Sequence, residues 1–307
     1  MSSRVIAPLA AVLALVAAGC GGGGGSGAVT ADGSSTVGPF TTKAAEDWKR
    51  DGGADVTVGI SGTGGGFERF CAGETDISNA SRPIKDEEAE VCEQNGIEYV
   101  ELQIAIDALT NVVNLENDWV DCLTVEQLNA IWKPGSTITS WKQVDPSFPD
   151  VRLQLYGAGT DSGTFDYFTE AINGEAGASR TDYSATEDDN VTVQGVAGNR
   201  GALGYFGFSY FEQNQDKLRA LEVDGGSGCV APSVETAQDG RYTPLSRPLF
   251  IYVKLDSLRE KPEVEEFVRY ALENEQRIAE EALFVPMSRA HIDEQLTKLD
   301  AAVGATQ

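Results

Sequence analysis

Apolar and polar positions along the chain follow two alternating patterns. Short runs rich in β-branched residues predict strands, and stretches with apolar residues three or four positions apart predict helices between them. We expect strands at 56–60, 104–113, 152–156 and 248–254, and helices at 66–72, 124–132, 164–172 and 264–283. Residues 204–211, rich in glycine and aromatic side chains, predict a strand followed by a turn. Strands that alternate with helices in this way are typical of an α/β fold.

The order of these elements favours two lobes joined by a hinge. The body that follows residue 27 has about 280 residues, which is enough for two lobes. The apolar run at 104–113 is expected to pass between the lobes, and the strand at 248–254 to return the chain to the first lobe. We therefore expect lobe 1 to comprise 28–109 plus 246–307 and lobe 2 to comprise 110–245. The two crossover segments would act as the hinge.

The N-terminus predicts export and a lipid anchor. Arg4 precedes an apolar run from Val5 to Ala18, which is too short for a membrane-spanning helix and is typical of a secretory signal. The run ends in Ala17-Ala18-Gly19-Cys20, which resembles a bacterial lipobox. We expect a signal peptide at 1–20, with Cys20 as the lipidated residue, and a flexible glycine-rich tether at 21–27. An ordinary signal peptide with an unrelated cysteine is the alternative.

The charge of the chain limits its partners. Acidic residues outnumber basic ones, 48 against 23, so nucleic acid and anionic membrane surfaces are not expected to bind. Local dipoles can outweigh net charge, because long-range electrostatic effects are screened within about 8 Å at physiological salt. The acidity therefore does not exclude an anionic ligand.

Four cysteines follow Cys20 in the sequence: Cys71, Cys92, Cys122 and Cys229. An even number in an exported chain favours two disulfides. Three pairings are possible, and we favour Cys71–Cys92, close in sequence, with Cys122–Cys229. A metal site is the alternative, but the chain has no Cys-x-x-Cys spacing and a single histidine.

One pattern of small polar residues occurs three times and is the most informative feature of the sequence. In each copy, glycine, serine and threonine lie directly before a stretch with helical periodicity. The three segments are Asp32-Gly33-Ser34-Ser35-Thr36-Val37-Gly38, Ser61-Gly62-Thr63-Gly64-Gly65-Gly66 and Gly159-Thr160-Asp161-Ser162-Gly163-Thr164.

Such segments suit a tetrahedral oxyanion. A helix N-terminus exposes N–H groups without intrahelical partners and carries about half a positive charge. Glycine lets the backbone approach a ligand, and serine and threonine hydroxyls add donors. Any one segment is also explained as an ordinary helix cap. None ends in the Gly-Lys-Ser/Thr of a nucleotide-binding loop.

With these loops and several further segments, the chain resembles the phosphate-binding (PstS-type) periplasmic proteins of bacterial phosphate ABC transporters. The likeness covers nearly all of the mature chain, and the motifs follow the family's order. The further segments are Thr75-Asp76-Ile77, Ala80-Ser81-Arg82-Pro83-Ile84, Glu187-Asp188-Asp189-Asn190 and Gly201-Ala202-Leu203-Gly204-Tyr205-Phe206.

The resemblance implies two α/β lobes of the periplasmic binding-protein kind that close over inorganic phosphate. It also implies delivery of phosphate to an ABC permease, outside the cytoplasm at the cell membrane, by a monomer without a cofactor. The phosphate-binding positions that it implies are Thr36, Val37, Ser61, Asp76, Ser162, Gly163 and Thr164. In this interpretation Asp76 accepts the proton of hydrogen phosphate, which sulfate lacks, and so discriminates between the two anions.

The chain departs from the family pattern in one respect. Better-known members have an arginine shortly before the Ser-Gly-Thr of the third loop, whereas residues 156–160 here contain none. We expect another arginine to reach the ligand, because a guanidinium suits bidentate contact with phosphate. Arg82 is the first candidate and Arg180 the second. A structural ion pair near the hinge is the alternative for Arg82.

Other functions fit the sequence less well. A serine hydrolase with Ser61 or Ser162 as nucleophile needs a Gly-x-Ser-x-Gly elbow, whose spacing fails at both serines, and a histidine base. The single histidine, His291, is expected on a polar C-terminal helix. No pair of acidic residues is singled out for a glycosidase. A sensor or surface adhesin on the same fold, and a binding protein for another oxyanion, remain as alternatives.

Overall fold

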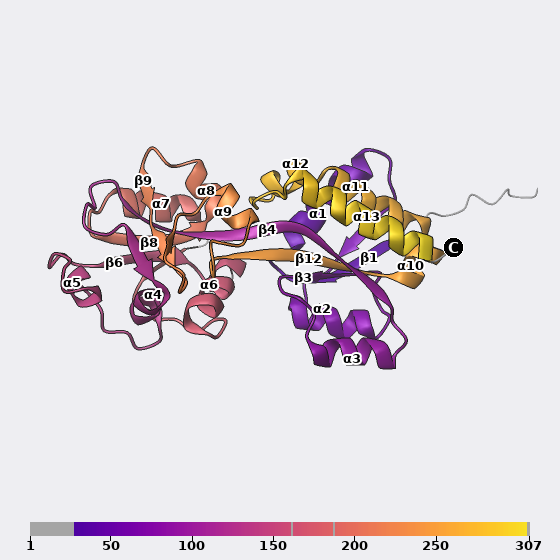
Figure 1. Cartoon of the computed structure of the whole chain (residues 1–307), viewed down its shortest axis with the longest axis horizontal. Helices are drawn as coiled ribbons and strands as arrows, with labels where there is room; N and C mark the ends of the chain where they lie inside the picture. The colour runs from indigo at the N-terminus through magenta and orange to yellow at the C-terminus, as the bar shows by residue number, and fades with distance from the viewer. Residues whose placement is uncertain (1–27, 161, 187, 306–307) are drawn as a thin grey trace, which may run out of the picture.

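The computed structural model describes residues 28–160, 162–186 and 188–305, which form two lobes connected by two long strands (Figure 1). The predicted signal peptide, Cys20 and the predicted tether lie outside these residues. Within the part of the chain described, no helix is both long enough and apolar enough to span a bilayer.

The strands are β1 (Val29–Gly33), β2 (Val56–Val58), β3 (Ile77–Ala80), β4 (Tyr99–Asn114), β5 (Cys122–Thr124), β6 (Gln154–Ala158), β7 (Ser184–Thr186), β8 (Ala202–Gly207), β9 (Leu218–Ala220), β10 (Glu222–Asp224), β11 (Cys229–Val230) and β12 (Ser246–Lys254). The helices are α1 (Gly38–Arg50), α2 (Gly62–Cys71), α3 (Asp86–Gln94), α4 (Val125–Trp132), α5 (Trp141–Val144), α6 (Gly163–Asn173), α7 (Asp189–Ala197), α8 (Phe208–Glu212), α9 (Val234–Gln238), α10 (Leu255–Glu260), α11 (Pro262–Glu273), α12 (Glu275–Glu281) and α13 (Arg289–Ala305).

Lobe 1 is built on the strand order β2-β1-β3-β12-β4. The pairs β1–β2 and β1–β3 are parallel, whereas β12 runs antiparallel to both β3 and β4. Helices α1, α11, α12 and α13 cover one face of this sheet, and α2 and α3 cover the other (Figure 1). Both faces are therefore buried, which explains why β4 is apolar along most of its length.

Lobe 2 continues the same sheet with β8, β6 and β7, while β9 pairs with β4. Strands β5, β10 and β11 form a separate three-stranded sheet. The main core packs α4 and α6 against the large sheet around Trp132, Phe168 and Tyr205. The rings of Phe168 and Tyr205 stack with centroids 3.7 Å apart, and Trp132 meets Tyr205 edge-on at 5.0 Å. Trp132, Phe168 and Tyr205 are thus residues of the hydrophobic core.

The two connecting strands form one continuous ladder between the lobes. β4 pairs with β12 as far as Ala108 opposite Ser246, and from Leu109 onward it pairs with β8. β4 therefore changes partner between Ala108 and Leu109, at the passage from one lobe to the other.

Two predicted elements differ from the structure. The long helix expected at 264–283 is wrong, because Asn274 interrupts it with φ −105° and ψ 12°, and two helices, α11 and α12, result. The turn expected after the strand at 204–211 is the short helix α8. The strands expected at 104–113 and 248–254 lie within β4 and β12.

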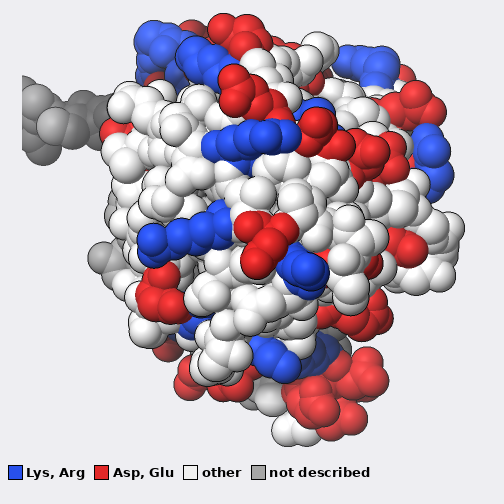
Figure 2. All heavy atoms as spheres, turned by 90° about the vertical axis from the view of Figure 1, so that its left-hand side faces the viewer, with Lys and Arg blue, Asp and Glu red and all other residues white. Residues whose placement is uncertain are grey.

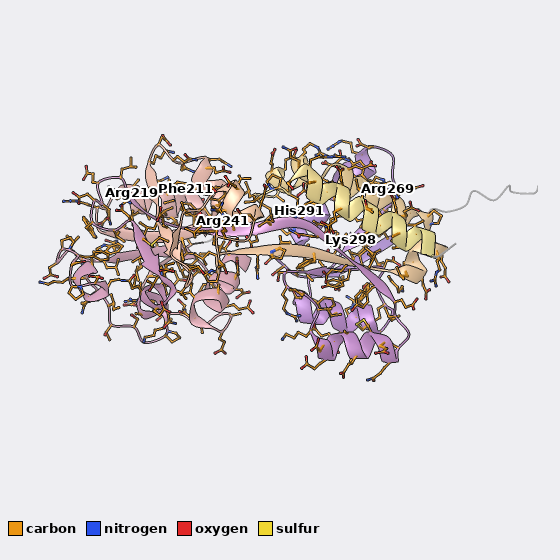
Figure 3. All side chains as sticks on the ribbon, in the orientation of Figure 1. Phe211, Arg219, Arg241, Arg269, His291 and Lys298 are labelled. Atoms are coloured by element: carbon orange, nitrogen blue, oxygen red, sulfur yellow. A yellow bond between two sulfur atoms is a disulfide. The ribbon has the colours of Figure 1, made fainter. Side chains whose placement is uncertain are left out.

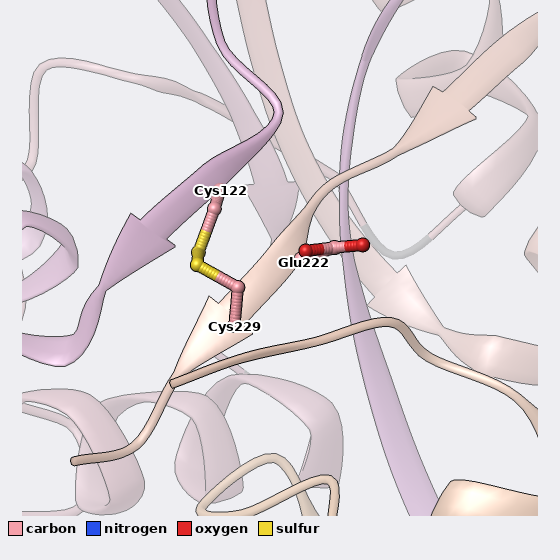
Figure 4. Close-up of side chains that lie close together, drawn as sticks. All are labelled: Cys122, Glu222 and Cys229. Carbon is pink, nitrogen blue, oxygen red and sulfur yellow. A yellow bond between two sulfur atoms is a disulfide. The ribbon is translucent and has the colours of Figure 1, made fainter. Parts of the chain in front are cut away.

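The structure contains the two favoured disulfides. Cys71–Cys92 joins α2 to the end of α3 in lobe 1, and Cys122–Cys229 joins β5 to β11 in lobe 2 (Figure 4). The carboxylate of Glu222 lies close to the second pair, but the two sulfur atoms are bonded to each other and offer no thiolate to a metal.

Basic and acidic side chains are interspersed on the outer end of lobe 2 (Figure 2). Arg219, labelled in Figure 3, pairs with Asp121 at 2.8 Å, and Arg200 pairs with Asp118 at the same distance. Such exposed pairs contribute at most about 1 kcal/mol each, so they do not determine the fold.

Candidate functional site

The first loop begins where β1 ends and leads into α1. Gly33 has a φ of +137°, and a side chain there would meet the carbonyl oxygen of Asn79 at 2.2 Å, so the turn requires glycine. Ser34 donates its N–H to that carbonyl oxygen at 2.9 Å, and its Oγ accepts from the N–H of Val37 at 3.4 Å. The N–H of Val37 is thus already engaged, while Thr36 lies half-buried at the start of α1.

The third loop connects β6 to α6 in lobe 2. Ser162 is the N-cap of α6, because its Oγ accepts from the N–H of Thr164 at 3.2 Å. A Cβ on Gly163 would lie 3.0 Å from Oγ1 of Thr36, so the first and third loops approach each other closely between the lobes. The N-terminal ends of α1 and α6 therefore face each other from opposite lobes.

A cavity of about 210 Å³ lies where these two loops meet, and we call it the cleft pocket. Lobe 1, lobe 2 and the connecting strand β4 all contribute to its wall. Its lining residues are Ser35, Thr36, Pro39, Asp107, Ser162, Gly163, Thr164, Asp189, Gly207, Tyr210, Ala282, Leu283 and Phe284. Of the predicted binding residues, Thr36, Ser162, Gly163 and Thr164 are brought together here. The two helix N-termini direct a positive dipole end at this space.

The second loop does not bring Ser61, which was expected to bind phosphate, to the cleft pocket. Ser61 is exposed, its N–H donates to Oδ1 of Asp32 at 3.0 Å, and it does not line the cleft pocket. Thr63 instead holds the start of α2 against the turn after β3, because its Oγ1 lies 3.1 Å from Oγ of Ser81 and accepts the N–H of Ser81 at 3.3 Å. Thr63 of the second loop and Ser81 of the turn after β3 therefore lie beside Arg82, whereas Ser61 contacts Asp32 instead.

Arg82 lies at the edge of the cleft and has a strong partner. Its two terminal nitrogens each donate to one carboxylate oxygen of Glu88 at 2.8 Å, and its guanidinium carbon lies 5.7 Å from the ring centroid of Phe67. The hydrogen bond with Glu88 raises the pKa of Arg82. A neighbouring cavity of about 290 Å³ has Ser81, Arg82, Tyr167, Glu170 and Arg247 among its lining residues.

The structure does not bring Asp76, which was expected to contact the ligand, to the cleft pocket. Asp76 is buried and directly precedes β3, which runs parallel to β1, so it lies at the opposite end of these strands from the first loop. Its carboxylate accepts from Lys261 Nζ at 2.9 and 3.0 Å, from Ser257 Oγ at 2.7 Å, and from both the N–H and Oγ1 of Thr30. Burial alone would raise the pKa of Asp76, but these hydrogen bonds outweigh it and lower the pKa. Asp76 is a structural carboxylate.

Arg180 is also structural. Its side chain is buried in lobe 2, where it donates to the carbonyl oxygens of Ile131 at 3.0 Å and Ile138 at 2.9 Å, and to Asp182 at 2.6 and 2.8 Å. These contacts satisfy carbonyl groups at and just beyond the end of α4. It is absent from the residues that line the cleft pocket.

Sequence reasoning missed three residues beside the cleft pocket: Asp107 lines this pocket, and Arg247 and Tyr167 line the neighbouring cavity of about 290 Å³. Arg247 on β12 lies opposite Asp107 on β4, with its nitrogens 3.2 and 3.3 Å from Oδ2 of that aspartate. Its guanidinium carbon also lies 3.7 Å from the ring centroid of Tyr167 on α6. One indication of this position was present in the sequence, because Arg247 directly precedes residues 248–254, which were expected to form a strand between the lobes.

The single histidine is not close to the candidate nucleophiles. His291 lies on α13 of lobe 1 (Figure 3) and lines a separate cavity of about 240 Å³ together with Gln103, Gln238 and Pro248. Oγ of Ser162 caps α6, as described above. Among the described residues that line the cleft pocket there is no histidine, so a Ser–His pair is not assembled there.

Comparisons with known proteins agree with this arrangement. Residues 19–275 match the model of the "PBP superfamily domain". The chain is 48% identical over 288 residues to Protein SphX of Synechocystis sp., covering 93% of this chain and 85% of that protein. It is 44% identical over 281 residues to the phosphate-binding protein PstS of Staphylococcus saprophyticus, covering 91% and 86%. The chain belongs to the PstS family.

Solved structures of PstS-like proteins share the fold. A possible phosphate binding protein from Planctomyces limnophilus superimposes with a TM-score of 0.85 at 46% identity, covering 90% of this chain and 99% of that one. An ABC-type phosphate transport receptor from Vibrio cholerae, at 24% identity, superimposes with a TM-score of 0.66 over 84% and 99% and supports the fold alone. The predicted two-lobed periplasmic binding-protein fold is confirmed, and the family is one of substrate-binding proteins rather than enzymes.

Proposed function

We propose that this protein captures inorganic phosphate between its lobes and delivers it to an ABC-type importer. The observation that carries the proposal is the approach of two helix N-termini, those of α1 and α6, from opposite lobes toward one cavity of about 210 Å³. The names of its PstS relatives point to the same ligand. The protein would act as a binding component without catalytic activity.

The donors suit a tetrahedral oxyanion. Thr36 contributes a hydroxyl from lobe 1, and Ser162 and Thr164 contribute hydroxyls from lobe 2. Oγ of Ser162 accepts from the N–H of Thr164, so its own proton is available to an anion in the pocket. Gly163 adds a backbone N–H in the first turn of α6, where no intrahelical partner exists.

We also propose boundaries for the two lobes and a position for the hinge between them. We divide the chain into lobe 1, at 28–109 plus 246–307, and lobe 2, at 110–245. The change of partner in β4 between Ala108 and Leu109 supports this division. Bending of β4 and β12 near these residues would open the cleft, and the bound anion would favour the closed state through contacts that only this state makes.

We further propose that Cys20 carries the lipid anchor and that the protein works as a monomer outside the cytoplasm, beside its permease. The apolar run before Cys20 and the tether after it support this proposal. Cys20→Ala should release the protein from membranes of the expressing cells into the soluble fraction. Retention of the Cys20→Ala variant in the membrane fraction would contradict the anchor.

Calorimetric titration tests the binding function. Residues 28–307, unfolded and refolded to remove bound ligand, would be titrated with phosphate and then with sulfate. Binding of phosphate at submillimolar or lower concentration, without comparable binding of sulfate, is expected. A folded, ligand-free sample that binds sulfate more tightly would assign the pocket to another oxyanion. A sample that binds neither anion would reject the transport function.

A further inference from the structure

Arg247 is the second residue of β12, at the end of this lobe 1 strand that lies nearest to lobe 2. It is directly opposite Asp107 in the β12–β4 ladder, at the point where both strands leave lobe 1. The side chain of Arg247 is 15% exposed and that of Asp107 is 10% exposed. Arg247 lines the neighbouring cavity of about 290 Å³ rather than the cleft pocket itself. Its guanidinium nevertheless reaches the wall of the cleft pocket, because it contacts Asp107 and Thr36, which both line that pocket.

The guanidinium contacts both lobes. One terminal nitrogen lies 3.2 Å from Oγ1 of Thr36 in lobe 1, and the guanidinium carbon lies over the ring of Tyr167 in lobe 2. Arginine only donates hydrogen bonds, so Oγ1 of Thr36 must accept, and the hydroxyl proton of Thr36 is directed elsewhere. Tyr167 is fixed in turn, because its hydroxyl donates to the carbonyl oxygen of Pro244 at 2.8 Å.

Three arginines lie in or near the regions predicted to bind the ligand, and their partners distinguish them. Arg82 forms a two-point contact with Glu88, with both distances at 2.8 Å, and Arg180 has a full set of partners inside lobe 2. Arg247 meets only one oxygen of Asp107, at 3.2 and 3.3 Å, longer than the usual 2.7–2.9 Å of a charged hydrogen bond. Asp107 orients this guanidinium without saturating it.

We infer that Arg247 is the cation that binds the anion in the cleft, with Asp107 and Tyr167 holding its guanidinium in place. The inference rests on the proposed phosphate-binding function. The anion would receive the guanidinium N–H groups from the start of β12, the Thr36 hydroxyl from one side and the N-terminus of α6 from the other. Arg247 is thus a ligand-binding residue, and Asp107 and Tyr167 are positioning residues.

The inference is tested by titrating phosphate into the ligand-free protein and four variants. Arg247→Gln removes the charge, and Arg247→Lys keeps the charge but loses the planar fork. Arg82→Gln is the matched control at the cleft edge. Because Arg247→Gln leaves Asp107 buried without its cation, the double variant Arg247→Gln/Asp107→Asn removes both charges and keeps the net charge of the protein unchanged. Circular dichroism and thermal melting would establish that each variant is folded.

Arg247→Gln is expected to weaken phosphate binding on the order of 100-fold, and Arg247→Lys about tenfold. The double variant should melt near the wild type yet bind phosphate as weakly as Arg247→Gln, which a loss of folding or of net charge would not produce. Arg82→Gln should stay within about threefold of the wild type. Wild-type affinity in a folded double variant would overturn the role of Arg247, and so would a large loss in Arg82→Gln alone. Absence of binding by the wild-type protein would instead reject the proposed function itself.

Discussion

Asp76 and Lys261 form an ion pair with Nζ 2.9 Å from Oδ1, although 185 residues separate them. The pair links the start of β3 to the residue before α11, and Ser257 and Thr30 complete the shell around the carboxylate. The family resemblance implied that Asp76 selects the ligand. In the structure, Asp76 instead connects the C-terminal helices to the sheet of lobe 1 through Lys261 and Ser257.

Asp76→Asn should destabilise the protein by about 3 kcal/mol and leave phosphate affinity within about twofold of the wild type. Because the folded state lowers the pKa of Asp76, its contribution is complete above the ordinary value of 3.8 and is lost as the pH falls through the lowered pKa. Urea denaturation of both proteins between pH 2 and 7 measures this, and their stabilities should converge at the acidic end. A large loss of phosphate affinity in a folded Asp76→Asn variant would return this residue to the binding site.

Ser162→Ala should weaken phosphate binding about tenfold or more, because the variant loses a hydroxyl donor in the cleft pocket. It also loses a helix cap, which costs about 1 kcal/mol of stability. Ser233→Ala is the matched control, since Oγ of Ser233 caps α9 by accepting from the N–H of Thr236 at 3.0 Å in the same lobe. Calorimetry and thermal melting of both variants separate the effects. Equal loss of affinity in the two variants would show that only the cap matters.

Arg180→Met should destabilise lobe 2 by about 2–3 kcal/mol, because it leaves the carbonyl oxygens of Ile131 and Ile138 without their donor. Phosphate affinity of the folded variant should equal that of the wild type. Chemical denaturation and calorimetry check the two halves of this prediction. Weaker binding without a change in stability is the result that would contradict it.

Glu275 should make the stability depend on pH in the neutral range. It is fully buried at the start of α12, where Oε1 accepts from the N–H of Met287 at 2.8 Å, and burial raises its pKa from 4.5 to about 8. The folded state then holds a proton that the unfolded state releases, so stability falls as the pH rises from about 4.5 to 8, by up to about 1.4 kcal/mol per unit. Glu275→Gln keeps the acceptor and should flatten this slope in urea titrations at pH 5, 6, 7 and 8. An unchanged slope would mean that Glu275 is ionised in the folded protein.

The two disulfides should differ in their contribution to stability. Cys122–Cys229 spans 107 residues and Cys71–Cys92 spans 21, and in the chain-entropy model a longer loop gives the larger stabilisation. Replacing the first pair by serine should cost about 4–5 kcal/mol, and replacing the second about 3 kcal/mol. Denaturation of the two double-serine variants gives the comparison. A greater cost for the Cys71–Cys92 pair would show that strain or local packing outweighs chain entropy.

The loops of the site were visible in the sequence because their chemistry is local. Gly33 is required by a backbone conformation, and Ser162 caps the helix that begins one residue later, so a few neighbouring residues determine each of these features. The strands at 104–113 and 248–254 were equally visible, since burial on both faces gives a continuous apolar run.

The expectations that the structure does not support concern residues whose partners are distant in the sequence. The environment of Asp76 comes from Lys261 and Ser257, and that of Arg180 from carbonyl groups more than 40 residues away. Arg247 was missed because its contact with Asp107 depends on the pairing register of β12 and β4, which no local pattern specifies. The break at Asn274 was missed because apolar periodicity continues on both sides of it.

Neither disulfide crosses the cleft, since one joins two helices of lobe 1 and the other joins two strands of lobe 2. Each disulfide therefore stabilises one lobe against unfolding. The angle between the lobes depends instead on the connecting strands β4 and β12. Oxidation in the extracytoplasmic space would protect the protein from unfolding without locking it open or shut. Resistance to unfolding and the capacity to open and close therefore depend on different parts of the molecule.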